Sequence, residues 1–306
     1  MKNCIICKNP LDDYEVIYNK VRGDNQKKCI VVKCIKCTHT QLINYEQDLK
    51  EHYENDNQDT EIKLNFNKTA KDIEATYFNI NTKRVKRIEN YNISINKNSK
   101  IIDIGAGLLY FPKMMKDKYK CIVEAIELST ARINKGLSIL DISENYFKIH
   151  SCLLDAEFAE KNKNSYDLVT IWHVLEHIEN VYEMVNNAFQ LLKPNGTLII
   201  ETPNEDDYLL QFDNYKSIMY QIHHLSYFTN TIFEKICKDL NIRNYKIKYF
   251  HRYDIKNFIG LILNNPQKSN AGCDGTTDNE LKDFWHKSLE NIKGTDSICL
   301  IIKGGN

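Results

Sequence analysis

Ile101–Gly107, which reads Ile-Ile-Asp-Ile-Gly-Ala-Gly, is the stretch of sequence that decides the fold. An apolar run that ends in glycines predicts a buried strand, a tight turn and the start of a helix. Glycines let a ligand approach the backbone closely, and the free N–H groups of a helix start bind polar or anionic groups. The dinucleotide pattern G-x-G-x-x-G fails, because Tyr110 stands at its last glycine position.

Further apolar runs follow this turn and alternate with segments of helical pattern. The expected strands are 100–104, 121–127, 146–150, 166–172 and 196–201. Strands that alternate with helices predict a doubly wound, mostly parallel, Rossmann-like sheet of the α/β class. Lys193–Gly196 contains Pro and Gly and predicts a turn. The runs 245–250 and 297–302 are expected as late antiparallel strands, and 264–280 as a loop.

The composition is that of an ordinary globular chain. Its 306 residues can form one large α/β domain and a small module. Lys+Arg and Asp+Glu are both 41, so no global basic field attracts nucleic acid, which is not an expected partner. The sequence lacks a signal-peptide pattern and an apolar run of about 20 residues, which predicts a cytoplasmic protein without a membrane span. It carries no signal for an oligomeric state.

Four of the ten cysteines form two Cys-x-x-Cys pairs, Cys4 with Cys7 and Cys34 with Cys37. A disulfide framework is not expected in the cytoplasm. Two such pairs supply the four thiolates of a tetrahedral Zn²⁺ site, and metal binding adds folding energy to so small a module. We therefore expect a structural zinc ribbon at 1–45 and a mostly helical linker or lid at 46–98. Coincidental pairing or a redox role is the alternative.

Glu127 ends the second expected strand, about 20 residues after the glycine turn. A carboxylate at this place can accept hydrogen bonds from both hydroxyls of a ribose. The alternative is an exposed glutamate at a strand end. The preceding glycine turn favours the ribose role.

Five segments together resemble the successive motifs of class I S-adenosylmethionine (SAM)-dependent methyltransferases. They are Asp103–Gly107, Ile126–Ser129, Tyr166–Val169 with His173–His177, Leu192–Gly196 and Glu201–Asn204. They occur in the family's order and at its spacings over roughly residues 75–250. The resemblance implies a SAM-dependent methyltransferase domain at 99–306, with acceptor-binding insertions at about 205–235 and 251–295.

The resemblance assigns the cofactor-binding residues by position. They are Asp103, Gly105, Ala106, Gly107, Glu127, Leu128, Trp172 and His173. In that assignment Glu127 holds the ribose, and Trp172 and His173 line the methionine side near the reacting methyl. Two departures stand out. The family's third glycine falls at Leu109, and the polar residue expected after the third strand falls near Cys152, with Asp155 three residues on.

A narrower resemblance is carried by the cysteine pairs with Tyr53–Asp56, by His224–Thr229, and by His251–Tyr253 with Asn257. These segments are similar to zinc-ribbon methyltransferases of bacterial surface-polysaccharide and sugar pathways. The likeness implies a sugar-like or sugar-nucleotide acceptor in surface polysaccharide biosynthesis. The residues expected to bind this acceptor are Tyr227, Arg252, Tyr253 and Asn257.

His224, and with less support His223, are the candidates for the catalytic base, because a neutral histidine can take a proton from an acceptor hydroxyl near pH 7. The alternative is that they cap a helix or bond the backbone. Arg252 could bind a phosphate or carboxylate, or form an ion pair. The resulting hypothesis is O-methylation of a sugar-like acceptor. A small phosphorylated acceptor, N- or C-methylation, and a non-catalytic zinc-ribbon scaffold are the alternatives.

His173–His177 also reads H-x-x-E-H, an inverted zinc-protease signature. We discount it, because the motif follows a strand in the region where strands alternate with helices, as in a parallel sheet. It also lacks an evident third metal ligand downstream. A metal ion shared by Glu176 and His177 is a further alternative, implied by quinone-pathway relatives of this fold.

Overall fold

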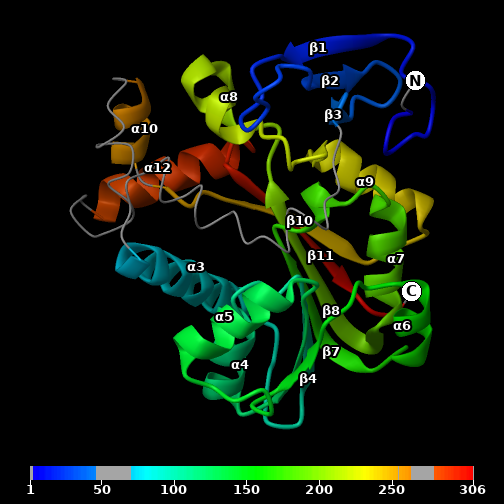
Figure 1. Cartoon of the computed structure of the whole chain (residues 1–306), viewed down its shortest axis with the longest axis vertical. Helices are drawn as coiled ribbons and strands as arrows, with labels where there is room; N and C mark the ends of the chain where they lie inside the picture. Colours follow the sequence, from blue (N-terminus) through cyan, green and yellow to red (C-terminus); the bar gives the residue numbers. More distant parts are fainter. Residues whose placement is uncertain (1–2, 46–69, 254, 263–278, 306) are drawn as a thin grey trace. The chain divides into compact units, whose positions relative to one another are not determined.

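The computed structural model describes residues 3–45, 70–253, 255–262 and 279–305 (Figure 1). The chain forms two compact units, each assembled from segments that are distant in the sequence. Unit 1 comprises Met1–Glu46, His173–Tyr182 and Ile200–Ile301. Unit 2 comprises Gln47–Trp172, Glu183–Ile199 and Ile302–Asn306.

Unit 2 is built on parallel strands. They are β4 (Lys100–Ile104), β5 (Ile122–Ile126), β6 (Lys148–His150) and β7 (Tyr166–Trp172). β4 pairs in parallel with β5 and with β7, and β5 pairs in parallel with β6. Ile101, Ile102 and Leu168 are fully buried in this sheet, as expected for parallel strands that are covered on both faces.

Helices precede, separate and follow these strands in the chain. They are α3 (Ala70–Asn90), α4 (Tyr110–Tyr119), α5 (Thr130–Leu140), α6 (Ala156–Lys161) and α7 (Val181–Gln190). Short polar side chains fix two of the helix starts. Ser129 accepts a hydrogen bond from the Arg132 N–H group at the start of α5, and Asp155 accepts one from Phe158 at the start of α6. Such caps satisfy N–H groups that have no partner inside the helix.

β8 (Leu192–Pro203) belongs to both units, because the chain passes from unit 2 to unit 1 within it. With β11 (Ser297–Lys303) and β10 (Tyr245–Phe250) it completes the hydrogen-bonded order β10-β11-β8-β7-β4-β5-β6. This order and the alternation of strand and helix confirm the predicted Rossmann-like α/β class. The two late strands stand where the sequence predicts them.

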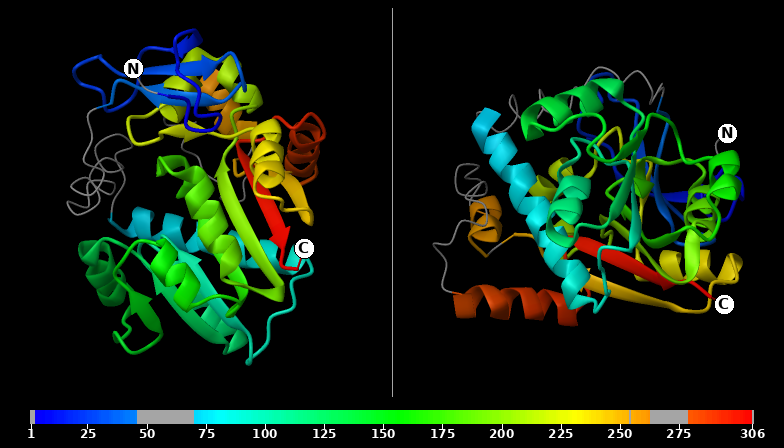
Figure 2. Two further views of the ribbon diagram at one scale, coloured as in Figure 1. Left: turned by 90° about the vertical axis from the view of Figure 1, so that its right-hand side faces the viewer. Right: turned by 90° about the horizontal axis from the view of Figure 1, so that it is seen from below.

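Unit 1 contains a second, antiparallel sheet with the order β1-β2-β3-β9. Its first three strands are β1 (Tyr14–Tyr18), β2 (Ile30–Cys34) and β3 (Thr40–Ile43), which lie in the N-terminal segment where a zinc ribbon is expected. The fourth is β9 (Ser226–Tyr227), which pairs with β3 although almost two hundred residues separate them in the chain. Figure 2 shows the blue N-terminal strands from two further directions.

Short helices make up much of the remainder of unit 1. They are the 3-10 turns η1 (Leu175–His177) and η2 (Tyr208–Gln211), with α8 (Asp213–Met219), α9 (Asn230–Asp239), α10 (Ile255–Ile262) and α12 (Asn279–Asn291). None of the helices in the described ranges combines the length and apolarity that a membrane crossing requires.

Two local predictions are wrong. The turn expected at Lys193–Gly196 is instead part of β8. There Gly196 lies so close to the Tyr166 carbonyl that an added Cβ would stand 2.7 Å from its oxygen, so this glycine serves strand contact and not reversal. The loop expected at 264–280 ends earlier, because α12 begins at Asn279. Residues 264–278, the segment Tyr53–Asp56 and the linker residues 46–69 lie outside the described ranges.

Candidate functional site

The glycine turn of unit 2 is tied to the end of β5. Gly105 and Ala106 donate backbone hydrogen bonds to the Ile126 carbonyl, over 2.8 and 3.0 Å. The Gly107 N–H group donates to Glu127 Oε2 over 2.7 Å, and the Ser129 N–H group donates to Glu127 Oε1 over 3.0 Å. Gly105 and Gly107 have φ angles of 72° and 56°, which glycine adopts without strain. The turn and the predicted ribose-binding carboxylate thus form one backbone cradle.

Leu109, which stands in place of the family's third glycine, has a φ of 64° and precedes the first turn of α4. This left-handed conformation costs a leucine about 1–2 kcal/mol. Its side chain is fully buried, which offsets that cost. Leu109 therefore adopts the left-handed backbone conformation that a glycine would adopt at this position.

Asp103 is buried, and its carboxylate accepts a hydrogen bond from the Thr170 hydroxyl over 2.6 Å. Burial raises the pKa of Asp103 to about 7, against the opposing effect of Thr170. Trp172 is also buried, with its ring 5.3 Å from that of Phe111 and its centroid 5.2 Å from the Arg84 guanidinium carbon. Leu128, predicted to pack on the adenine, is half-buried.

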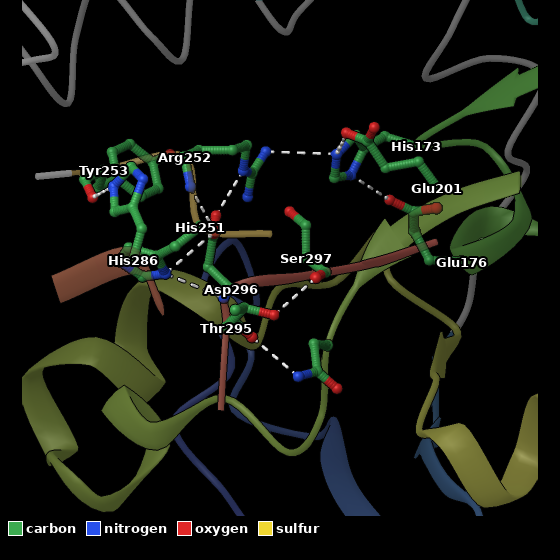
Figure 3. A network of polar contacts seen from close by, with 11 residues as sticks. His173, Glu176, Glu201, His251, Arg252, Tyr253, His286, Thr295, Asp296 and Ser297 are labelled. Atoms are coloured by element: carbon green, nitrogen blue, oxygen red, sulfur yellow. Dashed lines mark hydrogen bonds and ion pairs between the residues drawn. The ribbon is translucent and has the colours of Figure 1, made fainter. Parts of the chain in front are cut away.

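His173 is the centre of a polar network in unit 1 (Figure 3). Its Nδ1 lies 3.1 Å from Glu176 Oε1, and its Nε2 lies 2.9 Å from Glu201 Oε1. Its φ of 55° turns the chain sharply after β7, and its N–H group donates to the Glu201 carbonyl over 2.8 Å. Both carboxylates are only 1% exposed, so a histidine between them is held in a single orientation.

Arg252 approaches His173 from another part of unit 1, with Nη1 3.3 Å from His173 Nε2 (Figure 3). Its backbone N–H group and its Nε both donate to Asp296, which is fully buried. Burial would raise the pKa of Asp296, but Arg252 and His251 hold it well below its usual range. Of the two roles considered for Arg252, the structure shows the ion pair, with Asp296 as its partner. Acceptor binding stays a prediction.

Tyr253 packs its ring against the Arg252 guanidinium, at 5.4 Å, and its carbonyl accepts a hydrogen bond from His286 Nε2 over 2.9 Å. Asn257 lies in α10, and its side chain is outside the described part of the chain. Tyr227 is 1% exposed and packs on Tyr220, with ring centroids 5.0 Å apart. Acceptor binding by these residues also stays a prediction.

Two histidines from distant segments meet in unit 1. The rings of His177 and His224 lie 5.0 Å apart at 75°. His177 Nδ1 is 2.7 Å from the His223 carbonyl oxygen, and a carbonyl can only accept, so Nδ1 carries the proton. In neutral His177 the lone pair is therefore on Nε2. His223, a predicted base, contributes its carbonyl to this pair.

His224 has a different partner. Its Nε2 lies 2.5 Å from Nε2 of Gln221, an amide nitrogen that can only donate. The neutral ring of His224 therefore carries its proton on Nδ1. Burial lowers the pKa of His224 well below its usual value, and His177, His173, Arg22 and His223 lower it further.

Glu176, His177 and His224 bring one donor atom each to within 4.8 Å of one another, and all three side chains are buried. Glu176 Oε2 has no hydrogen-bond partner among the described residues. Two imidazoles and a carboxylate are a donor set that divalent transition metals accept. The zinc-protease reading is wrong, because Leu175–His177 is a single 3-10 turn, and His173 and His177 do not share a helix face.

The four predicted zinc ligands come together in unit 1. Cys4 and Cys37 sulfurs lie 3.5 Å apart, and Cys7 and Cys34 sulfurs 3.8 Å apart. All four sulfurs lie within 4.8 Å of one another. Thiolates at about 2.3 Å from a tetrahedral Zn²⁺ are about 3.8 Å apart, so the cysteines fit this metal.

A family model described as a methyltransferase domain matches residues 74–247, more than half of the chain. The chain belongs to this methyltransferase family. The matched range includes the glycine turn, Glu127, and the His177–His224 pair.

Curated relatives agree with the family. The chain is 27% identical over 158 residues to the ubiquinone biosynthesis O-methyltransferase of Coxiella burnetii, covering 50% of this chain and 60% of that one. It is 28% identical over 124 residues to the phosphoethanolamine N-methyltransferase of Plasmodium falciparum, covering 38% and 46% of the two chains. The chain thus spans about 60% or less of the length of these relatives, and neither is named as a polysaccharide enzyme.

Solved structures show the same fold. A SAM-dependent methyltransferase from Archaeoglobus fulgidus superposes with a TM-score of 0.51 at 15% identity, over 80% of this chain and 99% of that one. A chain from the complex of the Haloferax volcanii Trm112 methyltransferase activator with a methyltransferase gives 0.52 at 12% identity, over 86% and 100%.

The sequence missed Arg22, Gln221 and Asp296 as parts of the site. Arg22 and Gln221 are 199 residues apart, and Arg252 and Asp296 are 44 apart. No local pattern marks such partners, because their contacts arise only when the strands pair.

Proposed function

We propose that this chain is a SAM-dependent methyltransferase that transfers the methyl group to a hydroxyl oxygen of a small polar acceptor, sugar-like or a sugar nucleotide, in surface polysaccharide biosynthesis. The observation that carries the cofactor assignment is the cradle of Gly107, Ser129 and Glu127. It offers glycine backbone beside a fixed carboxylate, which is what a ribose at a strand end requires.

The residues present fit the cofactor. Glu127 is 7% exposed and is oriented by two backbone N–H groups. When bound, SAM supplies a methyl group that is activated as a sulfonium. The protein's part is to hold the acceptor oxygen in line with this methyl and to remove the hydroxyl proton.

We assign the proton-accepting role to His177, since its lone pair is on Nε2 and its Nδ1–H group is anchored on the His223 carbonyl. This moves the base from His224, the residue favoured by the sequence, because Gln221 occupies the Nε2 lone pair of His224. The Nδ1–H group of His224 is then a hydrogen-bond donor. With SAM bound, the acceptor oxygen would receive the methyl group, the SAM sulfur would be the leaving group, and His177 Nε2 would accept the hydroxyl proton.

The acceptor class rests on the polar character of unit 1. Glu176, Glu201 and Arg252 form with His173 a buried polar network that suits a hydroxylated acceptor more than an apolar one. The O-methyltransferase relative supports oxygen as the accepting atom. The phosphoethanolamine N-methyltransferase relative supports the alternative, a small phosphorylated metabolite.

We also propose that Cys4, Cys7, Cys34 and Cys37 hold a structural Zn²⁺. Four thiolates complete a tetrahedral shell and leave no position for a substrate. A divalent metal at Glu176, His177 and His224 is the second candidate for activating the acceptor hydroxyl, and it would require His224 to be released from its contact with Gln221. It is favoured by Glu176 Oε2, which has no hydrogen-bond partner among the described residues.

Methyl transfer is tested by incubating the protein with radiolabelled SAM and separate pools of nucleotide sugars and phosphorylated amines. Label that enters a nucleotide-sugar hydroxyl supports the proposal. Label that enters only phosphorylated amines supports the alternative. Binding of S-adenosylhomocysteine without transfer to either pool would reject both acceptor classes while the cofactor assignment stands.

A further inference from the structure

The segment 220–228, which carries His223 and His224, takes several of its backbone partners from the N-terminal strands and the loop between them. In β9, Tyr227 is paired with Thr40, and Ser226 with Gln41. The Leu42 N–H group donates to the Leu225 carbonyl over 3.1 Å. The buried side chains of His39 and Ser226 lie 3.2 Å apart. Because backbone polar groups that leave water need partners, this segment depends on the ribbon for its path.

Arg22 makes a second junction with the same segment. Its N–H group donates to the Tyr220 carbonyl over 2.9 Å, and its carbonyl accepts from Ile222 over 3.0 Å. These two bonds form a parallel bridge between Arg22 and Gln221. The next residue, Gly23, has a φ of 86°, and an added Cβ would stand 3.0 Å from the Ile222 side chain. The backbone at Arg22 and Gly23 therefore lies close to the backbone at Gln221 and Ile222, which places Arg22 opposite Gln221.

The side chains at this bridge form a chain of contacts that ends at His224. The Arg22 Nη2 donates to Gln221 Oε1, which fixes the amide group, since a guanidinium has no acceptor. With its oxygen facing Arg22, the amide turns its NH₂ group to His224, where Gln221 Nε2 and His224 Nε2 are 2.5 Å apart. Gln221 Nε2 is farther from His224 Nδ1, at 3.4 Å.

We infer that Arg22, a residue of the zinc-ribbon segment, is a positioning residue of the methyl-transfer site, which acts through Gln221 to hold His224 in the tautomer with the proton on Nδ1. The inference rests on the proposed function for its catalytic consequence, but the tautomer itself is independent of that function.

The N-terminal ribbon therefore contributes to the site itself, because its residue Arg22 sets the tautomer of His224. A His224 ring with the proton on Nδ1 can donate a hydrogen bond to an acceptor oxygen. The same ring with the proton on Nε2 would lose the Gln221 contact and could not donate from Nδ1. Tautomer control by the other ring nitrogen is a general device for orienting histidines.

The test uses the whole 306-residue chain, loaded with zinc and uniformly labelled with ¹⁵N. Ring nitrogen spectra identify the tautomer of His224, whose signals are assigned by their loss in His224→Gln. We compare wild type with Arg22→Met, which removes the charge and the donors, and with Arg22→Lys, which keeps the charge. Zinc content and S-adenosylhomocysteine affinity are measured for each variant to establish that the chain remains folded.

We expect one neutral tautomer of His224, protonated on Nδ1, in wild type. Arg22→Met should give a mixture of His224 tautomers, with Arg22→Lys between the two. The kcat of Arg22→Met should fall about 10- to 100-fold while the KM for SAM is unchanged, as expected for misplacement of a group near the reacting atoms.

Unchanged His224 ring signals in folded Arg22→Met would overturn the inference. If Arg22→Met does not fold, Gln221→Met tests the same contacts from the other side and leaves the ribbon sequence intact. Full turnover in His224→Gln would reject the hydrogen-bond donor role that the proposed mechanism gives to His224. The ring spectra would still decide whether Arg22 sets the tautomer, so the two failures are distinguishable.

Discussion

The Gly107 N–H group donates to the Glu127 carboxylate over 2.7 Å, which ties the glycine turn after β4 to the end of β5. The two residues are 20 positions apart, and the parallel pairing of β4 with β5 brings them to one edge of the sheet. A carboxylate held in this way has its orientation fixed before a nucleoside arrives. It also means that Glu127 supports the turn as well as the ligand.

Glu127→Gln should therefore weaken S-adenosylhomocysteine binding by about 10- to 100-fold, the effect of losing charged hydrogen bonds of about 1.5–3 kcal/mol. Isothermal titration calorimetry measures the affinity. The exposed Glu144→Gln is the matched control and should bind as wild type does. An affinity of Glu127→Gln equal to that of the control would contradict the ribose assignment.

His177→Gln should lower kcat by about 10²- to 10⁴-fold, the usual contribution of a general base, with cofactor affinity unchanged. His223→Gln is the control, since the backbone carbonyl of His223 bonds His177 and a side-chain substitution retains it. Steady-state kinetics with the acceptor found by screening give the comparison. A large loss in His223→Gln with normal turnover in His177→Gln would reverse the assignment.

Loss of zinc should loosen the segment 220–228 while the glycine turn of unit 2 keeps its protection. β9 pairs with β3, which begins three residues after the proposed zinc ligand Cys37, so unfolding of the ribbon removes the partners of β9. Hydrogen exchange of Cys34→Ser, with the half-buried Cys152→Ser as control, measures this. Equal protection of 220–228 in the two variants would show that the ribbon does not support the segment.

Metal analysis distinguishes the two activation schemes at Glu176. With His177 as a metal-free base, we expect one zinc per chain, which is lost in Cys34→Ser and retained in Glu176→Gln. Elemental analysis after dialysis against trace divalent metals measures the stoichiometry. A second equivalent that disappears in Glu176→Gln would instead support a metal at Glu176, His177 and His224, with its Lewis acidity activating the acceptor hydroxyl.

Glu205 should make the stability of the fold depend on pH. Burial raises its pKa from 4.5 to about 8, against the hydrogen bond from Tyr220. Between these values the native state binds more protons than the unfolded state, so stability falls as pH rises, and the loss is complete above the folded pKa. Glu205→Gln should remove this dependence and be more stable than wild type at about pH 9, by on the order of a few kcal/mol.

Urea unfolding at about pH 5 and about pH 9 measures the difference. Asp213→Asn is the control, because that side chain is 88% exposed and its neutralisation should leave the pH dependence unaltered. The same decline of stability with pH in Glu205→Gln as in wild type would place the responsible group elsewhere.

The sequence by itself determined the features that arise from neighbouring residues. The apolar run before Gly105 defines β4, and the alternation of strands and helices defines the parallel sheet. Both follow from the order of apolar and polar residues within each element, which predicts the residues that will be buried. The spacing of Cys4 with Cys7, and of Cys34 with Cys37, predicted a cluster that the fold does assemble. Where a local signal was misleading, as in the turn predicted at Lys193–Gly196, the pairing of β8 overrode the turn propensity.

Only the tertiary structure decided how the histidines are used. The motif around His177 allowed a helix with two metal-binding histidines, and the fold made a single 3-10 turn that presents His177 to the His223 carbonyl. Gln221 and Arg22 gave no sequence signal, because their contact depends on the pairing of two segments 199 residues apart. Which ring nitrogen carries a proton follows from the partner that the fold supplies, and that partner is not readable from the residues next to it in the chain.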